Sequence, residues 1–238
     1  MGNSPLKKHY ATAEKTGVLN ISKSRLDEFP PELKQLTGVL RSLDLSSNKF
    51  NRLPTEIGTF IHLKNLNLDH NNLTQLPLEI GNLVKLEIIT ATFNKLSSLP
   101  SSLSQLLNLK KVEFQRNELK TFPVMLCNLK HLDLLDLSCN KIESIPSEVG
   151  SLSVTELNLN QNQISSLAEE IADCPRLKTL RIQENCLKLS DVPPKILAHS
   201  NISTINAEGN LFDMKNFMEL DGYDEYMERY TAVKKKLF

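Results

Sequence analysis

Cysteine and histidine are the residue types in this 238-residue chain that could hold a metal ion or act as nucleophiles. The five histidines form no His-Glu-x-x-His motif, which would place two zinc ligands on one face of a helix. No two cysteines form a Cys-x-x-Cys pair; they are Cys127, Cys139, Cys174 and Cys186. We therefore expect neither a metal site nor a cofactor, and we interpret all four cysteines as packing or turn residues.

Sequence motifs of catalysis are also missing. No two glycines make Gly-x-Gly, and neither the phosphate-binding Gly-x-x-x-x-Gly-Lys-Ser/Thr nor the nucleophile motif Gly-x-Ser-x-Gly occurs. The 28 basic and 28 acidic residues cancel, which argues against a general nucleic-acid binder because such domains are strongly basic. We expect a protein that is not an enzyme and that does not bind nucleic acid.

The N-terminal sequence MGNSPLKK carries a signal for covalent modification. After removal of Met1, Gly2 would be placed for N-myristoylation, although Leu6 stands where the motif Met-Gly-x-x-x-Ser/Thr has a hydroxyl residue. The alternative is an ordinary Met-Gly start. One acyl chain binds membranes with an association constant of only about 10⁴ M⁻¹. A second contact is then needed, and Lys7 and Lys8 could supply it.

The expected location follows from three features of the sequence. There is no run of 18 apolar residues and no secretory signal, and the cysteine pattern suits a reducing compartment. We expect a peripheral protein on the cytoplasmic side of membranes, held by a lipid anchor, with a cytosolic pool. The lysines at 234–236 either contact lipid or are simply solvated, and both interpretations stay open.

The elements that would position a binding site follow a repeat. Leu132, Leu135, Leu137, Asn140 and Ile142 fit the pattern Leu-x-x-Leu-x-Leu-x-x-Asn-x-Leu. The asparagine recurs in steps of 23, 23, 23, 23, 22, 23 and 25 residues, at Asn48, Asn71, Asn94, Asn117, Asn140, Asn162, Asn185 and Asn210. This is the leucine-rich repeat pattern, and we expect the asparagine amides to form a structural ladder that bonds backbone groups of neighbouring coils.

The repeats predict an α/β fold, namely a leucine-rich repeat solenoid or horseshoe with a parallel sheet on its concave face. A degenerate first unit, with Ser24 in place of the asparagine, brings the number of units to nine. Leu-Pro pairs followed by apolar residues three and four apart indicate short helical or 3₁₀ segments on the convex face. We expect a lipidation site and capping helix over 1–16, the solenoid over 17–212, and a helical cap with a basic tail over 213–238. Within that last region, residues 217–230 show the period of one amphipathic helix.

The strand positions between the leucines should face the concave surface, because side chains alternate along a strand. Most are polar and mixed in sign, and His70 should also lie on this face as a polar surface residue. Apolar exceptions cluster in the middle of the chain. We predict a partner-binding patch there, made of Ile88, Phe93, Glu113, Arg116, Leu134 and Asp136. The alternative is that these are singly exposed apolar residues, which are common on protein surfaces.

Residues 17 to 212 resemble the intracellular leucine-rich repeat proteins with 23-residue Leu-Pro units, such as Ras suppressor and the scribble-type scaffolds. The resemblance rests on the repeated asparagines and Leu-Pro pairs, and outside them on the MGNS start and the tail GYDEYMERYTAVKKK. It implies a curved binding module with a lipidated N-terminus and no catalytic activity, and it identifies no binding residue. We expect a monomeric adaptor for protein partners. A regulatory subunit in a phosphatase or small-GTPase pathway, or a soluble scaffold without lipid, remains an alternative.

Overall fold

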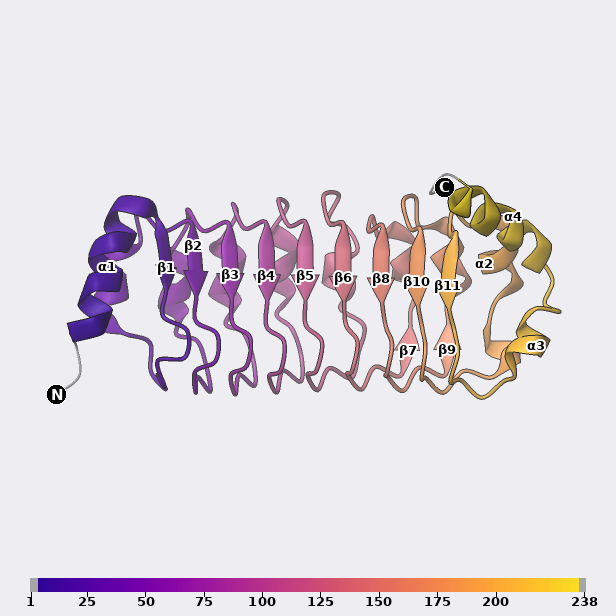
Figure 1. The fold of residues 1–238 in the computed structure, drawn as a ribbon, viewed down its shortest axis with the longest axis horizontal. Helices are drawn as coiled ribbons and strands as arrows, with labels where there is room; N and C mark the ends of the chain where they lie inside the picture. Colours follow the sequence, from indigo (N-terminus) through magenta and orange to yellow (C-terminus); the bar gives the residue numbers. More distant parts are fainter. Residues whose placement is uncertain (1–3, 236–238) are drawn as a thin grey trace. The chain divides into compact units, whose positions relative to one another are not determined.

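The computed structural model describes residues 4–235, and the chain forms two compact units, Met1–Glu118 and Leu119–Phe238. In the first unit one helix precedes five short parallel strands that pair in chain order (Figure 1). These elements are α1 (Ser4–Thr16), β1 (Val18–Asn20), β2 (Ser42–Asp44), β3 (Asn65–Asn67), β4 (Ile88–Thr90) and β5 (Lys111–Glu113). The register follows the repeat, so that Leu43 lies opposite Leu66.

Short 3₁₀ helices follow the first four strands, at Pro31–Leu36, Thr55–Thr59, Leu78–Asn82 and Ser101–Gln105. The prolines of the Leu-Pro pairs immediately precede them, and Pro54, Pro77 and Pro100 all have extended backbone. The proline ring holds φ near the value these positions need, and proline has no N–H that would require an acceptor. The predicted short helical segments are therefore confirmed.

The second unit repeats the plan with four parallel strands in one sheet and a separate strand pair. The sheet contains β6 (Leu134–Asp136), β8 (Glu156–Asn158), β10 (Thr179–Arg181) and β11 (Thr204–Asn206), and the pair is β7 (Ser144–Ile145) and β9 (Ser166–Leu167). Its 3₁₀ helices are Val124–Leu126, Ser147–Ser151, Glu169–Asp173 and Leu189–Asp191. Three α-helices complete it: α2 (Pro194–His199), α3 (Met214–Phe217) and α4 (Tyr223–Lys234). The described residues thus contain nine parallel repeat strands, which agrees with the nine units predicted from the sequence.

Burial alternates along each strand of the first unit. The central residue is buried, and it is an aliphatic residue in every case: Leu19, Leu43, Leu66, Ile89 and Val112. Most of the flanking residues are half-buried and point to the opposite face of the sheet, which we call the strand face. Three residues thus place one side chain in the core and two on an accessible surface.

The repeated asparagines bond at least three backbone groups each, and three of those bonded by Asn71 illustrate this. Its Oδ1 accepts from the Phe50 N–H at 3.1 Å, and its Nδ2 donates to the carbonyls of Leu45 and Leu68 at 3.1 and 2.9 Å. Two of these three groups belong to the preceding repeat. The Ser24 hydroxyl donates to the Ser22 carbonyl of its own repeat at 3.2 Å, whereas the Ser24 N–H donates to Asn48 Oδ1 of the next repeat at 3.1 Å. The asparagines therefore join neighbouring coils and satisfy buried backbone groups that would otherwise be unpaired.

The residue before each asparagine has a left-handed backbone conformation. These residues, with φ between 52 and 57°, are Ser47, His70, Phe93, Arg116, Cys139, Gln161 and Glu184, and the last repeat has Gly209 with φ 78°. Glycine, asparagine and aspartate adopt this conformation most readily, and it costs other residues about 1–2 kcal/mol each. The turn after each strand is therefore strained wherever glycine is absent.

The N-terminal cap agrees with the predicted helix. Helix α1 buries Tyr10 and Ala13 and packs on β1 and on the first 3₁₀ helix. It ends at Gly17, which has φ 71° and donates its N–H to the Ala13 carbonyl at 2.8 Å. A Cβ atom at this position would lie 2.8 Å from the Val39 carbonyl oxygen, so glycine is required both by conformation and by space.

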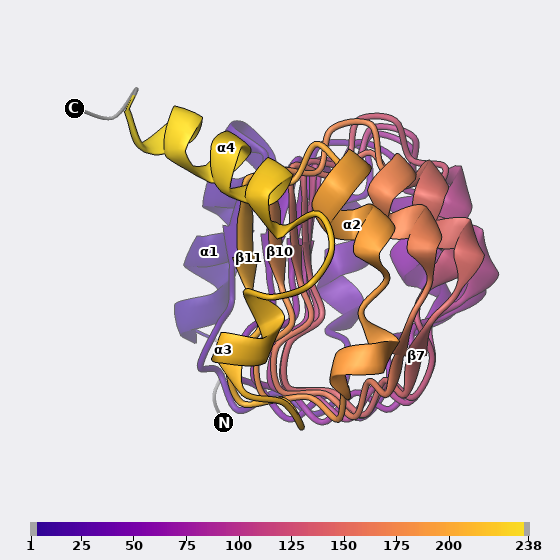
Figure 2. The same ribbon diagram turned by 90° about the vertical axis from the view of Figure 1, so that its right-hand side faces the viewer.

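The C-terminal region corrects the expectation of one helix over residues 217–230. Helices α3 and α4 are separate, and the chain turns between them at Gly222, which has φ 86°. Helix α4 then crosses one end of β11 while α3 lies at the other (Figure 2). The Tyr226 hydroxyl accepts from the Ile205 N–H at 3.1 Å, and the Arg229 Nε donates to the Ile202 carbonyl at 2.9 Å. Apolar spacing predicted a helix but did not reveal the break, because the apolar period continues across Gly222.

Candidate functional site

Three exposed side chains from successive repeats stack on one another in the first unit. The rings of His70 and Phe93 are nearly parallel, with an interplanar angle of 15° and centroids 4.2 Å apart. The Arg116 guanidinium carbon lies 4.9 Å from the centre of the Phe93 ring, on which it forms a cation–π contact. We call His70, Phe93 and Arg116 the turn stack. It combines an aromatic surface with a positive charge at the edge of the strand face.

The turns hold these side chains at a fixed spacing. The His70 N–H donates to the Thr92 carbonyl at 2.8 Å, and the Phe93 N–H donates to the Gln115 carbonyl at 3.1 Å. Each left-handed turn is thereby bonded to the next repeat, so the three side chains leave the backbone at equivalent points about 4.8 Å apart. Stacking follows from this repeat geometry once planar side chains occupy the position.

The other predicted patch residues of the first unit lie on β4 and β5. Ile88 is half-buried at the start of β4, and its side chain shares the strand face with Thr90. Glu113 forms an ion pair with Lys111 of the same strand, with 3.0 Å between Oε2 and Nζ. Phe93 is the most exposed apolar member, with 44% of its surface accessible. The first unit thus presents Ile88, Phe93, Glu113 and Arg116 on two neighbouring repeats.

Leu134 and Asp136 lie on β6 of the second unit. Leu134 is half-buried. Asp136 Oδ1 accepts from the Ser138 backbone N–H and hydroxyl at 2.9 and 2.7 Å, and Oδ2 accepts from Asn158 Nδ2 at 3.0 Å. The Asp136 carboxylate therefore stabilises the turn after its strand. Asp44 accepts from the Ser46 N–H in the same way. The sequence signal for this turn-stabilising role is an Asp or Asn two residues before the turn, which is the pattern of an Asx turn.

The sequence interpretation missed the part that His70 plays. It placed His70 on the surface as a polar residue, whereas the ring stacks on Phe93. The signal that could have found this contact is the 23-residue spacing of His70, Phe93 and Arg116 in one column of the repeat. Gly2, the predicted lipidation site, lies outside the described residues. Lys7 and Lys8 are exposed on α1.

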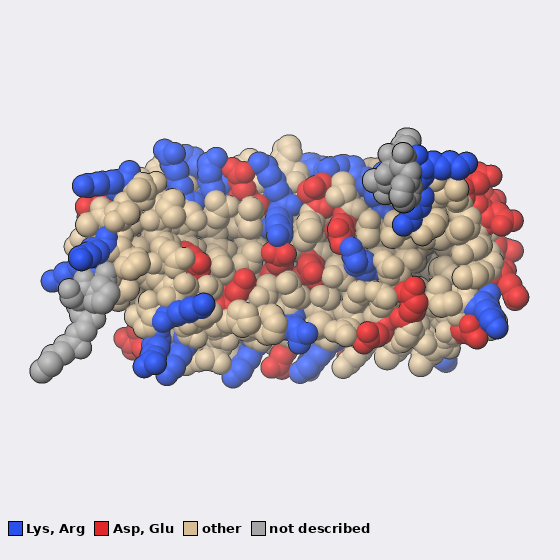
Figure 3. All heavy atoms as spheres, in the orientation of Figure 1, with Lys and Arg blue, Asp and Glu red and all other residues tan. Residues whose placement is uncertain are grey.

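Charges of both signs are present on the strand face, and neither covers it (Figure 3). Within the described residues, no group of three His, Cys, Asp or Glu side chains could hold a metal ion. Cys127 and Cys174 are buried, and burial raises the pKa of both thiols to about 12. These two groups are therefore protonated and unreactive in the folded state. No helix among residues 4–235 is long and apolar enough to cross a bilayer.

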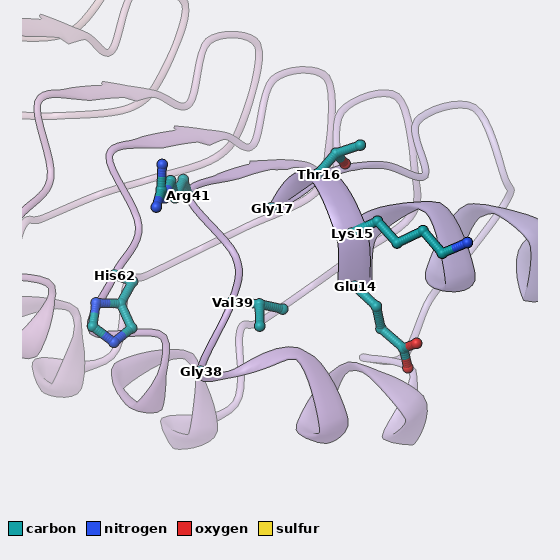
Figure 4. Close-up of a pocket in the computed structure, with 8 residues that line it drawn as sticks. All are labelled: Glu14, Lys15, Thr16, Gly17, Gly38, Val39, Arg41 and His62. Atoms are coloured by element: carbon teal, nitrogen blue, oxygen red, sulfur yellow. The ribbon is translucent and has the colours of Figure 1, made fainter.

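A cavity of about 370 Å³ lies beside the end of α1, lined by residues that include Lys15, Gly17, Arg41 and His62. Its polar side chains do not converge: Lys15 and Glu14 extend away from Arg41 and His62 (Figure 4). A catalytic or ligand site needs polar groups directed at a common point. This cavity lacks that arrangement, so the turn stack is the candidate site that the described residues support best.

Comparison with known proteins agrees with the architecture. Residues 130–187 match one Leucine rich repeat family model, and residues 39–60 and 62–83 match another. A leucine-rich repeat protein of Leptospira interrogans is 29% identical, with a TM-score of 0.74 over 91% of this chain and 61% of its own. An internalin of Listeria monocytogenes shows the same fold at 23% identity, with a TM-score of 0.75 over 90% of this chain and 61% of its own. The chain thus spans about three-fifths of the length of these two proteins.

A plant receptor extends the comparison to a solved complex. The receptor kinase HAESA of Arabidopsis, solved with the peptide hormone IDA and the co-receptor SERK1, is 28% identical, with a TM-score of 0.68 over 81% of this chain and 33% of its own. The class that fold and site define is therefore a repeat protein whose ordered strands present one side-chain surface. The chain therefore has the leucine-rich repeat solenoid fold, and the leucine-rich repeat family models match parts of its sequence.

Proposed function

We propose that this protein is a non-catalytic adaptor that binds a protein partner through the strand face of its first unit. The observation that carries the proposal is the turn stack, in which an exposed Phe93 ring lies between His70 and Arg116. Aromatic and arginine side chains dominate the binding energy of protein interfaces. Phe93 is exposed and has a left-handed backbone, and both are unfavourable for a phenylalanine. Its ring also contributes nothing to the core.

The arrangement supports rigid presentation. Backbone bonds to the next repeat hold the turns, and the asparagine amides hold the coils, so little of the surface has to become ordered when a partner binds. A preorganised surface loses less conformational entropy on association. The receptor kinase HAESA, which is similar in fold, is solved in complex with a peptide hormone and a co-receptor, and we extend polypeptide binding to this chain as part of the proposal.

Affinity capture with matched variants tests this function. Wild type, Phe93→Ala, Arg116→Glu and the control Leu78→Ala are used to capture proteins from cell extract, which are then quantified by mass spectrometry. Leu78 is 64% exposed on a 3₁₀ helix, so its truncation removes a comparable apolar surface away from the strand face. We expect one set of proteins to be lost with the first two variants and kept with the control. Equal capture by all four folded proteins would exclude the turn stack as the binding surface.

We further propose that Gly2 carries a myristoyl group that holds the protein reversibly on cytoplasmic membrane faces. The proposal is supported by the Met-Gly-Asn-Ser start and by the exposure of Lys7 and Lys8 on α1. Intact mass after expression in eukaryotic cells should show the added acyl group, and Gly2→Ala should move the protein to the soluble fraction. An unmodified mass together with unchanged fractionation would refute the anchor.

A further inference from the structure

Basic side chains surround the turn stack without acidic partners. The loops at 47–52, 70–75 and 93–98 contain Lys49, Arg52 and Lys95 and no Asp or Glu. All three are exposed, and basic side chains gather along the lower edge of the first unit (Figure 3). Within residues 4–235 neither these three nor Arg116 forms an ion pair. The loop of Arg116, at 116–121, adds Lys120 and one acidic residue, Glu118, so this edge of a neutral protein carries a local excess of positive charge.

Four lysines elsewhere in the first unit are paired with carboxylates. Lys64 and Lys110 flank Glu87 at 2.9 and 2.6 Å, and Lys34 contacts Glu56 at 3.2 Å. Lys111 contacts Glu113 at 3.0 Å. Carboxylates thus balance these four lysines, whereas Lys49, Lys95 and Arg116 form no ion pair with any of the described residues. The aromatic rings of His70 and Phe93 beside these cations distinguish this edge from an ordinary solvated surface.

The position of Arg116 suits it to bind a carboxylate. Its guanidinium lies over the Phe93 ring, which supports one face of the planar group. The N–H donors of an arginine point outward in that plane, where they can engage both oxygens of one carboxylate. The ring also restrains the side chain before any ligand arrives, so less rotamer entropy is lost on binding.

We propose that the turn edge of the first unit, formed by the turn stack with Lys49 and Lys95, binds an extended acidic segment of a protein partner. This proposal rests on the proposed function and names the chemistry of the partner. Lys49 and Lys95 lie two repeats apart, roughly 10 Å, and an extended chain covers that distance in about three residues. Carboxylates at every third position therefore match the lysines, with a further carboxylate on Arg116.

A peptide titration tests the chemistry directly. The probe is a fluorescein-labelled decapeptide with glutamate at every third position, and its reference has glutamine at those positions. We expect fluorescence anisotropy to show binding of the glutamate peptide alone, weakened by added NaCl because exposed charges are screened. Arg116→Gln should weaken binding about tenfold and Lys95→Gln about threefold. Lys85→Gln, which removes an exposed lysine from the segment before β4, should leave the affinity unchanged.

Several outcomes would overturn the proposal. Equal binding of the glutamate and glutamine peptides would exclude carboxylate recognition. An affinity that Arg116→Gln leaves unchanged would place the contact elsewhere. A preference for a phosphoserine peptide or for phosphatidylserine vesicles would identify a different class of partner. If Phe93→Ala abolishes cellular capture while no acidic peptide binds, the interaction function stands and this chemistry does not.

Discussion

The Arg116 guanidinium lies over the Phe93 ring, at 4.9 Å from its centre, and both residues have left-handed backbone conformations. Both residues therefore have an unfavourable backbone conformation. Their side-chain contact contributes little to folding, because an exposed cation–π pair stabilises a protein by only about 0.5–1 kcal/mol. The backbone cost is of similar or larger size, at about 1–2 kcal/mol for each residue. Ser47, Cys139, Gln161 and Glu184 carry the same backbone cost, so the left-handed conformation belongs to the repeat turn, and what is particular to this pair is the exposed cation–π contact.

The backbone at position 93 gives a prediction about glycine and alanine. Phe93→Gly should be more stable than Phe93→Ala by about 1 kcal/mol, because glycine adopts φ near 52° without strain and alanine does not. Urea denaturation of both variants measures the difference. Lys95, outside the left-handed positions, is the control: there the glycine variant should be the less stable. The same order at both positions would contradict a strained turn.

The asparagine ladder predicts unequal costs along the chain. Asn71→Ala should lower the free energy of unfolding by about 3 kcal/mol or more, because three buried backbone groups lose their partner. Asn210→Ala should cost clearly less, since Asn210 is half-buried and water can replace its bonds. Chemical denaturation checks both, and equal losses would show that the amide bonds do not depend on burial.

Glu87 predicts a pH dependence. Hydrogen bonds from Lys110 and then Lys64 lower the pKa of this carboxyl to about 2. A lowered folded-state pKa stabilises the protein above the unfolded-state pKa of about 4.3, and this contribution disappears as the pH falls towards 2. The stability difference between wild type and Glu87→Gln should therefore be constant near neutrality and vanish in that window. An NMR titration showing an ordinary glutamate pKa would contradict this.

Gly222 should be intolerant of a side chain. A Cβ atom there would lie 2.5 Å from the Ala198 backbone nitrogen, and φ is 86°. We expect Gly222→Ala to cost ~2 kcal/mol or more and to speed hydrogen exchange in α4. Gly38→Ala is the matched control, because nothing lies within 4 Å of its added methyl group. Unchanged exchange in both variants would mean that α4 does not depend on this turn.

The cysteines should divide into two reactivity classes. At pH 8, iodoacetamide should modify Cys186 and Cys139, which are exposed and half-buried. Cys127 and Cys174 should react only after unfolding, because burial raises the pKa of both thiols to about 12. Mass spectrometry of the native and the urea-unfolded protein counts the modified residues. Rapid modification of all four in the native protein would contradict the buried positions.

The sequence alone determined the repeat, because the residues that recur with the repeat period are the same residues that form the core. A strand of three residues with a buried centre requires an aliphatic residue at a fixed step, and Leu43, Leu66 and Ile89 satisfy it. The asparagine column, the Leu-Pro segments and the N-terminal helix follow from local rules in the same way. Of the predicted patch, spacing placed Phe93 and Arg116 on neighbouring repeats.

Only the tertiary structure decided which surface residues act together. In the structure the His70 ring stacks on Phe93, the Asp136 carboxylate is hydrogen-bonded in a turn, and the C-terminal cap is divided into two helices at Gly222. Each outcome depends on a contact across repeats or on a backbone angle. The 23-residue spacing shows which side chains are neighbours, but it does not show that they stack or bond. Core residue types recur because every coil buries the same face. Surface residue types vary from one repeat to the next, so the contacts between them become visible only when the coils are stacked.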